Sequence, residues 1–326
     1  MAKQAVLLLA HGTPETVEQI PEYLSNVTGG RPLPPEVVEE IQRRYALIGH
    51  SPLTEITLEQ ARLVEIELSH PSRKNNDAAR VGHPEIPVYV GMRNWRPYIA
   101  DVVRQMRADG VEEAAVLCLA PQNSRLSVGL YRRALETAIA AGASGLRIDF
   151  TESWARHPFL IDAFAERLRT AWNKLSAEAG APVPVLFTAH SVPIRTIEAS
   201  QGQPADSYAE EARRTAELVV AQMPEIPQWF FAFQSQGVSG GPWLGPTVEE
   251  TLQSIAASGG KTVLLQPIGF LCDHVEILYD VDILFREYAA KLNLRLERTE
   301  SLNASGPLAK AVADLARQGL ARLNSR

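Results

Sequence analysis

Two histidines occupy matching positions in the chain, each at the end of a short apolar run. His11 closes the run that begins at Val6, and the same pattern of Ala-His, a small residue and a later proline recurs 179 positions further on, around His190. An imidazole titrates near neutral pH, so it can accept a proton or bind a metal ion. If both runs are parallel strands, both histidines lie at the carboxyl edge of a sheet, where ligands bind in open α/β folds. For His190, a structural histidine with one backbone hydrogen bond is the alternative.

A second group of candidate residues is acidic and lies within 269–282. Glu276 and Asp280 are four residues apart, so a helix puts both carboxylates on one face, where like charges repel by roughly a few tenths of a kcal/mol. A cation or a proton that passes between them would make this arrangement easier to tolerate. Leu284 is apolar and interrupts the face one turn later. The alternative for Glu276 is structural, because Asp273 is placed to cap the helix and Glu276 would complete a capping box.

Aromatic, hydroxyl and guanidinium groups complete the candidate site. A strand-like run leads into a loop rich in glycine and proline that carries Trp243, whose indole suits stacking on a large flat ligand and could also simply cover the core edge. Arginine and hydroxyl groups that converge on one cleft favour a ligand bearing carboxylates. Each such residue alone is also compatible with a solvated surface position. We expect these residues to bind substrate: Arg31, Ser51, Arg93, Ser124, Arg125 and Trp243.

Short β-rich runs alternate with longer amphipathic segments along the chain, which is typical of βα units in a parallel sheet. The predicted strands are Val6–His11, Val88–Met92, Ala114–Leu119, Leu146–Thr151, Val183–Thr188, Trp229–Phe233 and Thr262–Gln266. The predicted helices are Pro35–Gly49, Glu55–Leu68, Arg96–Ala108, Leu126–Ala140, Pro158–Ala177, Tyr208–Met223, Val248–Ser258, His274–Lys291 and Leu308–Leu323. The polar, irregular segment His70–Pro87 is expected to be a surface loop.

These elements predict a doubly wound α/β fold. The repeated Ala-His segment indicates two similar, flavodoxin-like halves with parallel sheets, whose strand ends face a shared cleft. The length of 326 residues fits two such units. We place the N-terminal half at 1–160 and the C-terminal half, with His190 and Glu276, at 161–326.

Composition excludes several classes of protein. With 32 Lys+Arg against 38 Asp+Glu, the net charge of -6 argues against a nucleic-acid binder. Cys118 and Cys272 are the two cysteines, too few for a disulfide scaffold, a zinc ribbon or a four-cysteine cluster within this chain. No apolar run reaches the roughly 18 residues of a membrane span, and the first run is too short for a signal peptide, so we expect a cytoplasmic protein without an integral membrane segment. The motifs of dinucleotide binding, P-loop hydrolysis, zincins and α/β-hydrolases are missing.

Five sequence blocks, in family order, resemble ferrochelatases over essentially the whole chain. They are Ala-His-Gly-Thr-Pro-Glu at 10, Gly-His-Ser-Pro-Leu at 49, Phe-Thr-Ala-His-Ser-Val-Pro at 187, Phe-Gln-Ser-Gln with Pro-Trp-Leu-Gly-Pro at 233–246, and Gly-Phe-Leu-Cys-Asp-His-Val-Glu-Ile-Leu-Tyr-Asp at 269. The resemblance implies an enzyme that inserts Fe(II) into a porphyrin in haem biosynthesis. Iron would then be a substrate, and no cofactor would be permanently bound.

The resemblance also assigns roles to residues of this chain. The cleft histidine of the family falls on His190 and its glutamate on Glu276, which makes them the catalytic and metal-binding candidates. Asp280 is a further metal-binding candidate on the same acidic face. His11 matches a position where many bacterial relatives have a tyrosine that faces the macrocycle from the opposite side. The resemblance therefore adds two residues to the expected substrate-binding set: His11 and Gln234.

The identity of the porphyrin is a finer question. The first half, including Leu119-Ala120-Pro121, resembles ferrochelatases that use coproporphyrin III more than those that use protoporphyrin IX. Coproporphyrin III carries four propionates and protoporphyrin IX two, so an arginine-lined cleft suits the former. Protoporphyrin IX is the first alternative, and a sirohydrochlorin or cobalt chelatase and a non-catalytic porphyrin carrier are the others. The chain ends at Arg326 without the cysteine-bearing extension of some relatives, so we expect no iron–sulfur cluster, and we expect a monomer.

Overall fold

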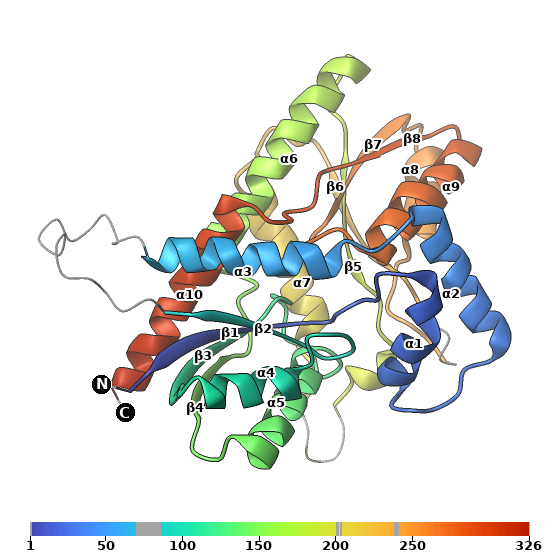
Figure 1. Cartoon of the computed structure of the whole chain (residues 1–326). Helices are drawn as coiled ribbons and strands as arrows, with labels where there is room; N and C mark the ends of the chain where they lie inside the picture. Colours follow the sequence, from blue (N-terminus) through green and yellow to red (C-terminus); the bar gives the residue numbers. More distant parts are fainter. Residues whose placement is uncertain (1, 70–85, 200–201, 203, 238–240, 326) are drawn as a thin grey trace, which may run out of the picture.

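The computed structural model describes residues 2–69, 86–199, 202, 204–237 and 241–325. These residues form two four-stranded sheets in which every paired strand is parallel to its neighbour (Figure 1). The first sheet has the order β2-β1-β3-β4 and the second the order β6-β5-β7-β8. The strands are β1 Gln4–Ala10, β2 Val88–Met92, β3 Glu113–Cys118, β4 Arg147–Thr151, β5 Val185–His190, β6 Trp229–Gln234, β7 Thr262–Pro267 and β8 Arg295–Arg298.

The two sheets share one strand order, with β5 standing in the second sheet where β1 stands in the first. Both are inner strands, and both are buried along nearly their whole length. His11 follows the last residue of β1, and His190 is the last residue of β5. The predicted α/β fold of two similar halves with parallel sheets is therefore confirmed.

Helices of very different length cover the sheets. They are α1 Ile20–Thr28, α2 Pro35–Ile48, α3 Leu53–Ser69, α4 Ile99–Ala108, α5 Val128–Gly142, α6 Pro158–Ala179, α7 Tyr208–Val220, α8 Val248–Ala257, α9 Arg286–Lys291 and α10 Gly306–Asn324, with short 3-10 turns η1 Val17–Gln19 and η2 Ile194–Thr196 and the π-helix η3 Glu276–Phe285. Within the residues that the structure describes, none of these helices combines the length and apolar character that a membrane span requires.

Four elements of the described residues were not predicted: the strand β8, the short helix α1 and the 3-10 turns η1 and η2. β8 was not predicted, because its sequence Arg-Leu-Glu-Arg has a single apolar residue and pairs only along the sheet edge with β7. The short helix α1 was not predicted either. The predicted strand at Val183 starts two residues too early, because Pro184 has no N–H for the ladder and β5 begins after it. The predicted loop at 70–87 lies almost entirely outside the described residues.

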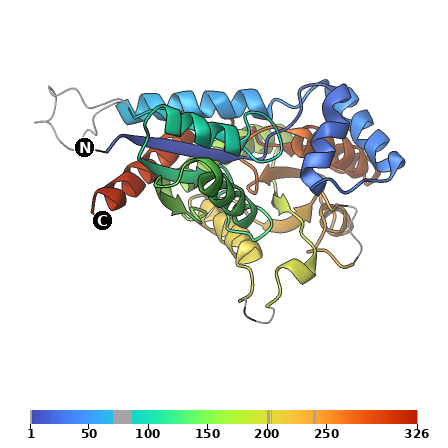
Figure 2. The same ribbon diagram turned by 60° about the horizontal axis from the view of Figure 1, so that its bottom comes forward.

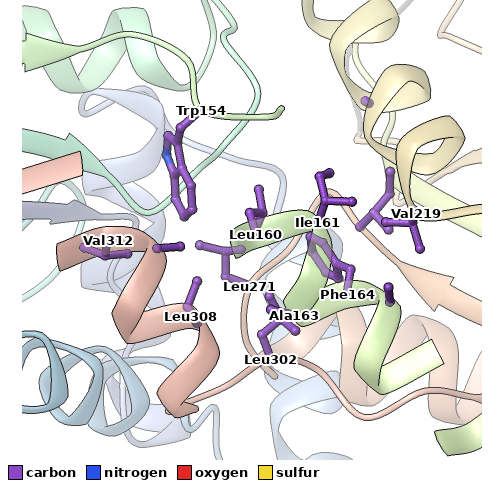
Figure 3. Close-up of a cluster of buried hydrophobic side chains, with 14 of the residues drawn as sticks. Trp154, Leu160, Ile161, Ala163, Phe164, Val219, Leu271, Leu302, Leu308 and Val312 are labelled. Carbon is purple, nitrogen blue, oxygen red and sulfur yellow. The ribbon is translucent and has the colours of Figure 1, made fainter. Parts of the chain in front are cut away.

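One continuous hydrophobic core joins the two sheets. Side chains of β1 and β3 in the first sheet and of β5 and β7 in the second belong to the same cluster as those of α6 and α10. Figure 3 shows part of this cluster, with Leu160 and Phe164 of α6 beside Leu271 and the side chains of α10. The sheets are thus held in a fixed relation to each other by shared apolar burial.

The last helix returns to the first sheet. α10 packs against α3, β3 and β4 as well as against α6. Gly319 permits this approach, since a Cβ there would lie 3.0 Å from the Cβ of Ala115. Both termini lie at the same end of the molecule in Figures 1 and 2, where Gln4 Nε2 donates a hydrogen bond to Asn324 Oδ1 at 2.8 Å. The division of the chain at residue 160 stays a prediction, and the C-terminal helix lies on the N-terminal sheet.

We expect Phe164→Ala to lower the free energy of unfolding by about 3–5 kcal/mol, because the ring is 2% exposed and its removal leaves a cavity in the shared core. Urea unfolding followed by tryptophan fluorescence and circular dichroism measures this loss. Both halves should unfold in one transition, because the same cluster supports both sheets. Phe159→Ala on the same helix is the control, with a smaller loss expected from its half-buried ring. Two well-separated transitions in the wild type would contradict a shared core.

Candidate functional site

A cleft of about 360 Å³, open to solvent at its mouth, lies at the carboxyl ends of the central strands. Residues of both halves line it, so it is the shared cleft that the repeated segment predicts. Apolar and aromatic side chains make up much of the wall, and polar groups are spread among them. The residues that line the cleft include His11, Tyr23, Arg93, Gln122, Ser124, Leu126, Ser127, Tyr131, His190, Tyr208, Trp243, Phe270, Cys272, His274 and Glu276.

His190 presents one ring nitrogen to the cleft and uses the other to fix its orientation. Its Nδ1 contacts the carbonyl oxygen of Ser191, which can only accept a hydrogen bond, so Nδ1 carries a hydrogen. Nε2 lies 3.4 Å from Oε1 of Glu276. The ring packs edge-on against Phe270, and Tyr208 Oη donates to the main-chain oxygen of His190 at 2.9 Å. The neutral ring would therefore point its lone pair at the carboxylate.

Glu276 is the first residue of the π-helix η3, and its carboxylate lies between two histidines. Oε2 is 3.4 Å from Nε2 of His274, while Oε1 faces His190. His274 resembles His190 in its tautomer, since its Nδ1 donates to the Cys272 carbonyl oxygen at 3.0 Å. The two imidazoles approach one carboxylate from separate segments of the chain.

Glu276 does not form the capping box that the sequence offered as its structural alternative. Asp273 does not cap the helix: its carboxylate accepts hydrogen bonds from Ser301 Oγ at 2.7 Å and Asn303 Nδ2 at 3.0 Å, and pairs with Arg298 at 3.2 Å. The helix has no side-chain cap at its start. Glu276 therefore takes no part in a helix cap, and its carboxylate faces His190 and His274.

The charged forms of His190 and Glu276 stabilise each other. Burial opposes protonation of His190, but the adjacent Glu276 carboxylate, the Ser191 carbonyl and Asp280 together outweigh that cost, so the pKa of His190 is raised above its usual range. Burial likewise favours the neutral acid of Glu276, yet His190 and His274 outweigh it and hold the pKa of this carboxyl well below its usual range. Both side chains are about a third exposed, 32% and 33%, so solvent moderates the interaction. The result is an imidazole that holds a proton more readily than an isolated histidine would.

A glycine allows this geometry. Gly269 lies on the loop after β7, and a Cβ there would be 2.8 Å from the Cα of Ala189 and 3.3 Å from the backbone nitrogen of His190. These distances are too short for any side chain. The loop that leads to Glu276 can therefore reach the end of β5 only because residue 269 is glycine.

Asp280 lies one turn beyond Glu276 and is not part of the cleft wall. It is 4% exposed, accepts a hydrogen bond from Ser235 Oγ, and lies 3.4 Å from Nη1 of Arg44 on α2. Burial raises its pKa to about 6. An arginine thus covers the acidic residue that was expected to share one face with Glu276, and Leu284 beyond it is 37% exposed. Among the residues that the structure describes, no group of three or more His, Cys, Asp or Glu side chains is arranged to hold a metal ion.

His11 lines the same cleft from the first half. Its Nε2 is 2.8 Å from the hydroxyl of Tyr23, and the amide nitrogen of Asn94 lies 3.2 Å from Nδ1. Burial lowers the pKa of His11 to about 4, and the positive charge of Arg93 acts in the same direction. The ring is therefore neutral at physiological pH, and its pKa is shifted in the direction opposite to that of His190.

Arg93 also lines the cleft. Its guanidinium lies 5.9 Å from the centre of the Tyr131 ring, and its Nε is buried without a hydrogen-bond partner in the described part of the chain. A buried N–H that lacks an acceptor carries a free-energy cost, which an anionic ligand would remove. This is the clearest anion-binding feature of the cleft.

The other predicted substrate-binding residues divide into two groups. Ser124 and Trp243 line the cleft, and Ser191 Oγ donates to the Leu244 carbonyl beside the indole at 2.9 Å. The expected convergence of the rest is wrong: Arg31, Ser51, Arg125 and Gln234 do not line it.

Each of these four side chains is engaged elsewhere. Arg31 is exposed and its Nε donates to Thr28 O at 3.1 Å, while Ser51 is buried and accepts from Thr13 Oγ1 at 3.0 Å. Arg125 pairs with Asp206 at 3.5 Å. Gln234 donates to the Glu276 carbonyl oxygen at 3.2 Å and thereby contacts the main chain of η3.

The sequence prediction did not include five ring-bearing residues of the cleft wall: Tyr23, Tyr131, Tyr208, Phe270 and His274. Only Phe270 and His274 had a visible signal, because both stand in the same block as Glu276. Tyr23 belongs to a helix that was not predicted, and Tyr208 reaches the cleft through the packing of α7. Their positions depend on tertiary contacts that no local pattern encodes.

Comparison with known proteins shows the family to which the chain belongs. The family model described as ferrochelatase matches residues 3–320. The chain belongs to the ferrochelatase family. It is 52% identical to the ferrochelatase of Acidobacterium capsulatum, over 99% of this chain and 96% of that protein. It is also 35% identical to the coproporphyrin III ferrochelatase of Mycolicibacterium vanbaalenii, over 97% and 89% of the two chains.

A solved structure supports the fold. The sirohydrochlorin chelatase SirB from Bacillus subtilis in complex with cobalt matches with a TM-score of 0.59 and 12% identity, over 99% of this chain and 98% of that one. At this identity the similarity is one of fold alone. The protein is thus a ferrochelatase, a lyase of haem biosynthesis that inserts iron into a porphyrin, and the alternatives of a sirohydrochlorin chelatase and a non-catalytic carrier lose their support.

We expect Gly269→Ala to reduce the rate of metal insertion at least about tenfold, because the new Cβ must push the end of β5, and with it His190, away from Glu276. Zinc insertion into a porphyrin, followed by fluorescence, measures this rate. Gly306→Ala is the matched control, since no atom lies within 4 Å of a Cβ at that position. Wild-type turnover in Gly269→Ala would contradict the close packing described here.

Proposed function

We propose that this ferrochelatase inserts ferrous iron into coproporphyrin III, with His190 and Glu276 on the side from which the metal enters. The observation that carries the assignment of the site is the contact between these two side chains at the wall of a cleft that both halves line. An imidazole beside a carboxylate supplies both requirements of the reaction, a proton acceptor and an attraction for a cation.

The chemistry follows from the tautomer of His190. Metal insertion requires that two pyrrole N–H protons leave the macrocycle while one divalent ion enters it. With Nδ1–H bonded to the Ser191 carbonyl, the lone pair of neutral His190 is at Nε2, the nitrogen that faces Glu276. We assign to Nε2 the acceptance of the two pyrrole protons in turn, the first passing to solvent at the exposed part of the ring before the second is taken, and to Glu276 the stabilisation of the resulting imidazolium and the attraction of the incoming ion.

His11 has a different role in this proposal. Its neutral ring is tied to Tyr23 and lies on the first half of the chain, so it suits contact with the macrocycle rather than proton transfer. The walls of the cleft, Trp243 included, favour a puckered ring whose nitrogens point toward the metal, a shape closer to the transition state. Iron is a substrate here, and the proposal includes no resident cofactor.

His190→Ala should abolish metal insertion while porphyrin binding stays within about tenfold of the wild type, because the imidazole acts on the inner nitrogens and not on the propionates. Glu276→Gln keeps the shape of the side chain and removes its charge, so turnover should also fall severely. Zinc is a suitable probe, because imidazole and carboxylate ligands accept Fe(II), Zn(II) and Co(II) alike.

The two readouts are zinc insertion by fluorescence and porphyrin affinity by Soret titration. The control is Glu249→Gln, an acidic residue in the first turn of α8 that does not line the cleft. Zinc insertion at the wild-type rate by His190→Ala would contradict the assignment of His190 as the proton acceptor. Normal turnover by Glu276→Gln, with the cost confined to stability, would return Glu276 to a structural role.

Coproporphyrin III is supported by the anion-binding features of the cleft. Arg93 has a buried Nε without a partner among the described residues, and the hydroxyl groups of Ser124 and Ser127 lie on the same wall. Propionates supply acceptors for these donors, and coproporphyrin III carries twice as many as protoporphyrin IX. The name of the relative from Mycolicibacterium vanbaalenii points the same way.

Anaerobic steady-state assays with Fe(II) should give a kcat/KM at least about tenfold higher for coproporphyrin III than for protoporphyrin IX, which corresponds to roughly one charge-assisted hydrogen bond. Arg93→Ala should reduce this preference by raising the KM for coproporphyrin III. Arg107→Ala, which removes an exposed arginine of α4, should leave both values unchanged. A higher kcat/KM for protoporphyrin IX would overturn the proposed substrate while leaving the family assignment intact.

A further inference from the structure

Two carboxylates at the start of α7 hold a loop that belongs to the other half of the molecule. Oδ2 of Asp206 accepts a hydrogen bond from the backbone N–H of Arg125 at 2.7 Å, and Oε2 of Glu211 accepts one from the backbone N–H of Asn123 at 2.7 Å. Asp206 is 4% exposed, so its bond is formed largely out of water. Charge-assisted bonds of this kind are stronger than bonds between neutral groups.

The loop held in this way forms part of the cleft wall. It connects β3 to α5, and Gln122, Ser124, Leu126 and Ser127 of this loop all line the cleft. The loop is also anchored at its start, where Gln122 Nε2 donates to the Ile268 carbonyl oxygen at 3.1 Å. Ser124 and its neighbours therefore depend on the second half for their position.

The same turn of α7 supports the catalytic histidine. Tyr208 follows Asp206 by two residues, and its backbone N–H donates to Oδ1 of that carboxylate at 2.9 Å. The hydroxyl of Tyr208 in turn donates to the main-chain oxygen of His190 at 2.9 Å. One helical turn thus contacts both the loop of the first half and the strand end that carries the imidazole.

The remaining bonds of these acids fix them in place. Glu211 accepts from Ser153 Oγ at 2.7 Å through Oε2 and from Ser207 Oγ at 2.9 Å through Oε1. Asp206 also pairs with the guanidinium of Arg125, whose Nη2 donates to the Glu198 carbonyl oxygen at 3.1 Å. Moving a fully bonded, partly buried carboxylate costs free energy, because its hydrogen bonds must break. Asp206 and Glu211 therefore hold the loop in a fixed position.

We propose that Asp206 and Glu211 are positioning residues, which set the place of the porphyrin relative to His190 by holding residues 122–127 against the first turn of α7. The proposal rests on the proposed use of the cleft for porphyrin. Neither acid lines the cleft, so both act through the loop, and Asp206 also bonds the backbone N–H of Tyr208. Loosening the loop would move the polar groups that orient the macrocycle and leave the metal-side pair of His190 and Glu276 in contact.

The test uses Asp206→Asn and Glu211→Gln, which keep the shape of each side chain and replace a charged acceptor by a neutral one. Glu210→Gln is the matched control, because Glu210 lies on the same turn, is 80% exposed and pairs with Arg156 only at 3.8 Å. Zinc insertion is measured with the porphyrin varied at saturating metal and with the metal varied at saturating porphyrin, for coproporphyrin III and for protoporphyrin IX. Urea unfolding confirms that each variant is folded.

We expect the KM for porphyrin to rise about tenfold in each variant, with the KM for zinc within about twofold of the wild type and Glu210→Gln unchanged in both. The Soret band of the bound porphyrin should shift in the two variants and not in the control. A purely structural role would instead lower the unfolding midpoint and leave both KM values as they are, which would overturn the inference.

The outcome separates this inference from the proposed substrate. If the wild type prefers protoporphyrin IX, the choice of coproporphyrin III fails, and the positioning role is still decided by the ratio of variant to wild type with the preferred porphyrin. If both variants keep the wild-type KM with either porphyrin, the positioning role fails while the substrate stands.

Discussion

The approach of the loop after β7 to the end of β5 is the constraint on which the site depends. Gly269 is packed so closely against Ala189 that a methyl group cannot be added, and a few residues later the chain enters η3 with Glu276 as its first residue. β5 and β7 are neighbours in a parallel sheet, so both carboxyl ends reach one edge. The 3.4 Å contact of His190 with Glu276 is the product of that pairing.

The two-half architecture supplies the rest of the cleft. Equal strand order puts the ends of β1 and β5 at corresponding places, and a core shared by both sheets fixes the distance between them. Apolar burial sets the relation of the two sheets, and polar contacts then fix the position of the loop between β3 and α5. Asp206 and Glu211 bind backbone N–H groups of the opposite half, and such bonds locate a loop far more narrowly than non-directional packing does.

The fold was predictable from sequence, because alternating apolar runs and a repeated Ala-His segment report directly on strands and their ends, whereas the pairing of His190 with Glu276 was implied by the resemblance to ferrochelatases. The direction in which each side chain points was not predictable from sequence. Arg125 stands in the predicted loop, yet its guanidinium turns to Asp206, a residue 81 positions away that no local pattern links to it. Asp280 has the expected helical spacing from Glu276, but α2 brings Arg44 over it. Both outcomes depend on which elements pack together, and that information is not local.

The repeat itself shows how environment overrides sequence. His11 and His190 end the same motif, but their pKa values move in opposite directions. Burial acts against the charged form of both rings. Beside His11 stands the cation Arg93, which adds to that effect, whereas beside His190 stands the anion Glu276, which reverses it. A duplicated strand end therefore yields one neutral ring and one basic ring across a single cleft. In the proposed mechanism, proton acceptance and the attraction of a divalent ion consequently belong to the same side of the macrocycle, and the opposite side is left to contact and shape.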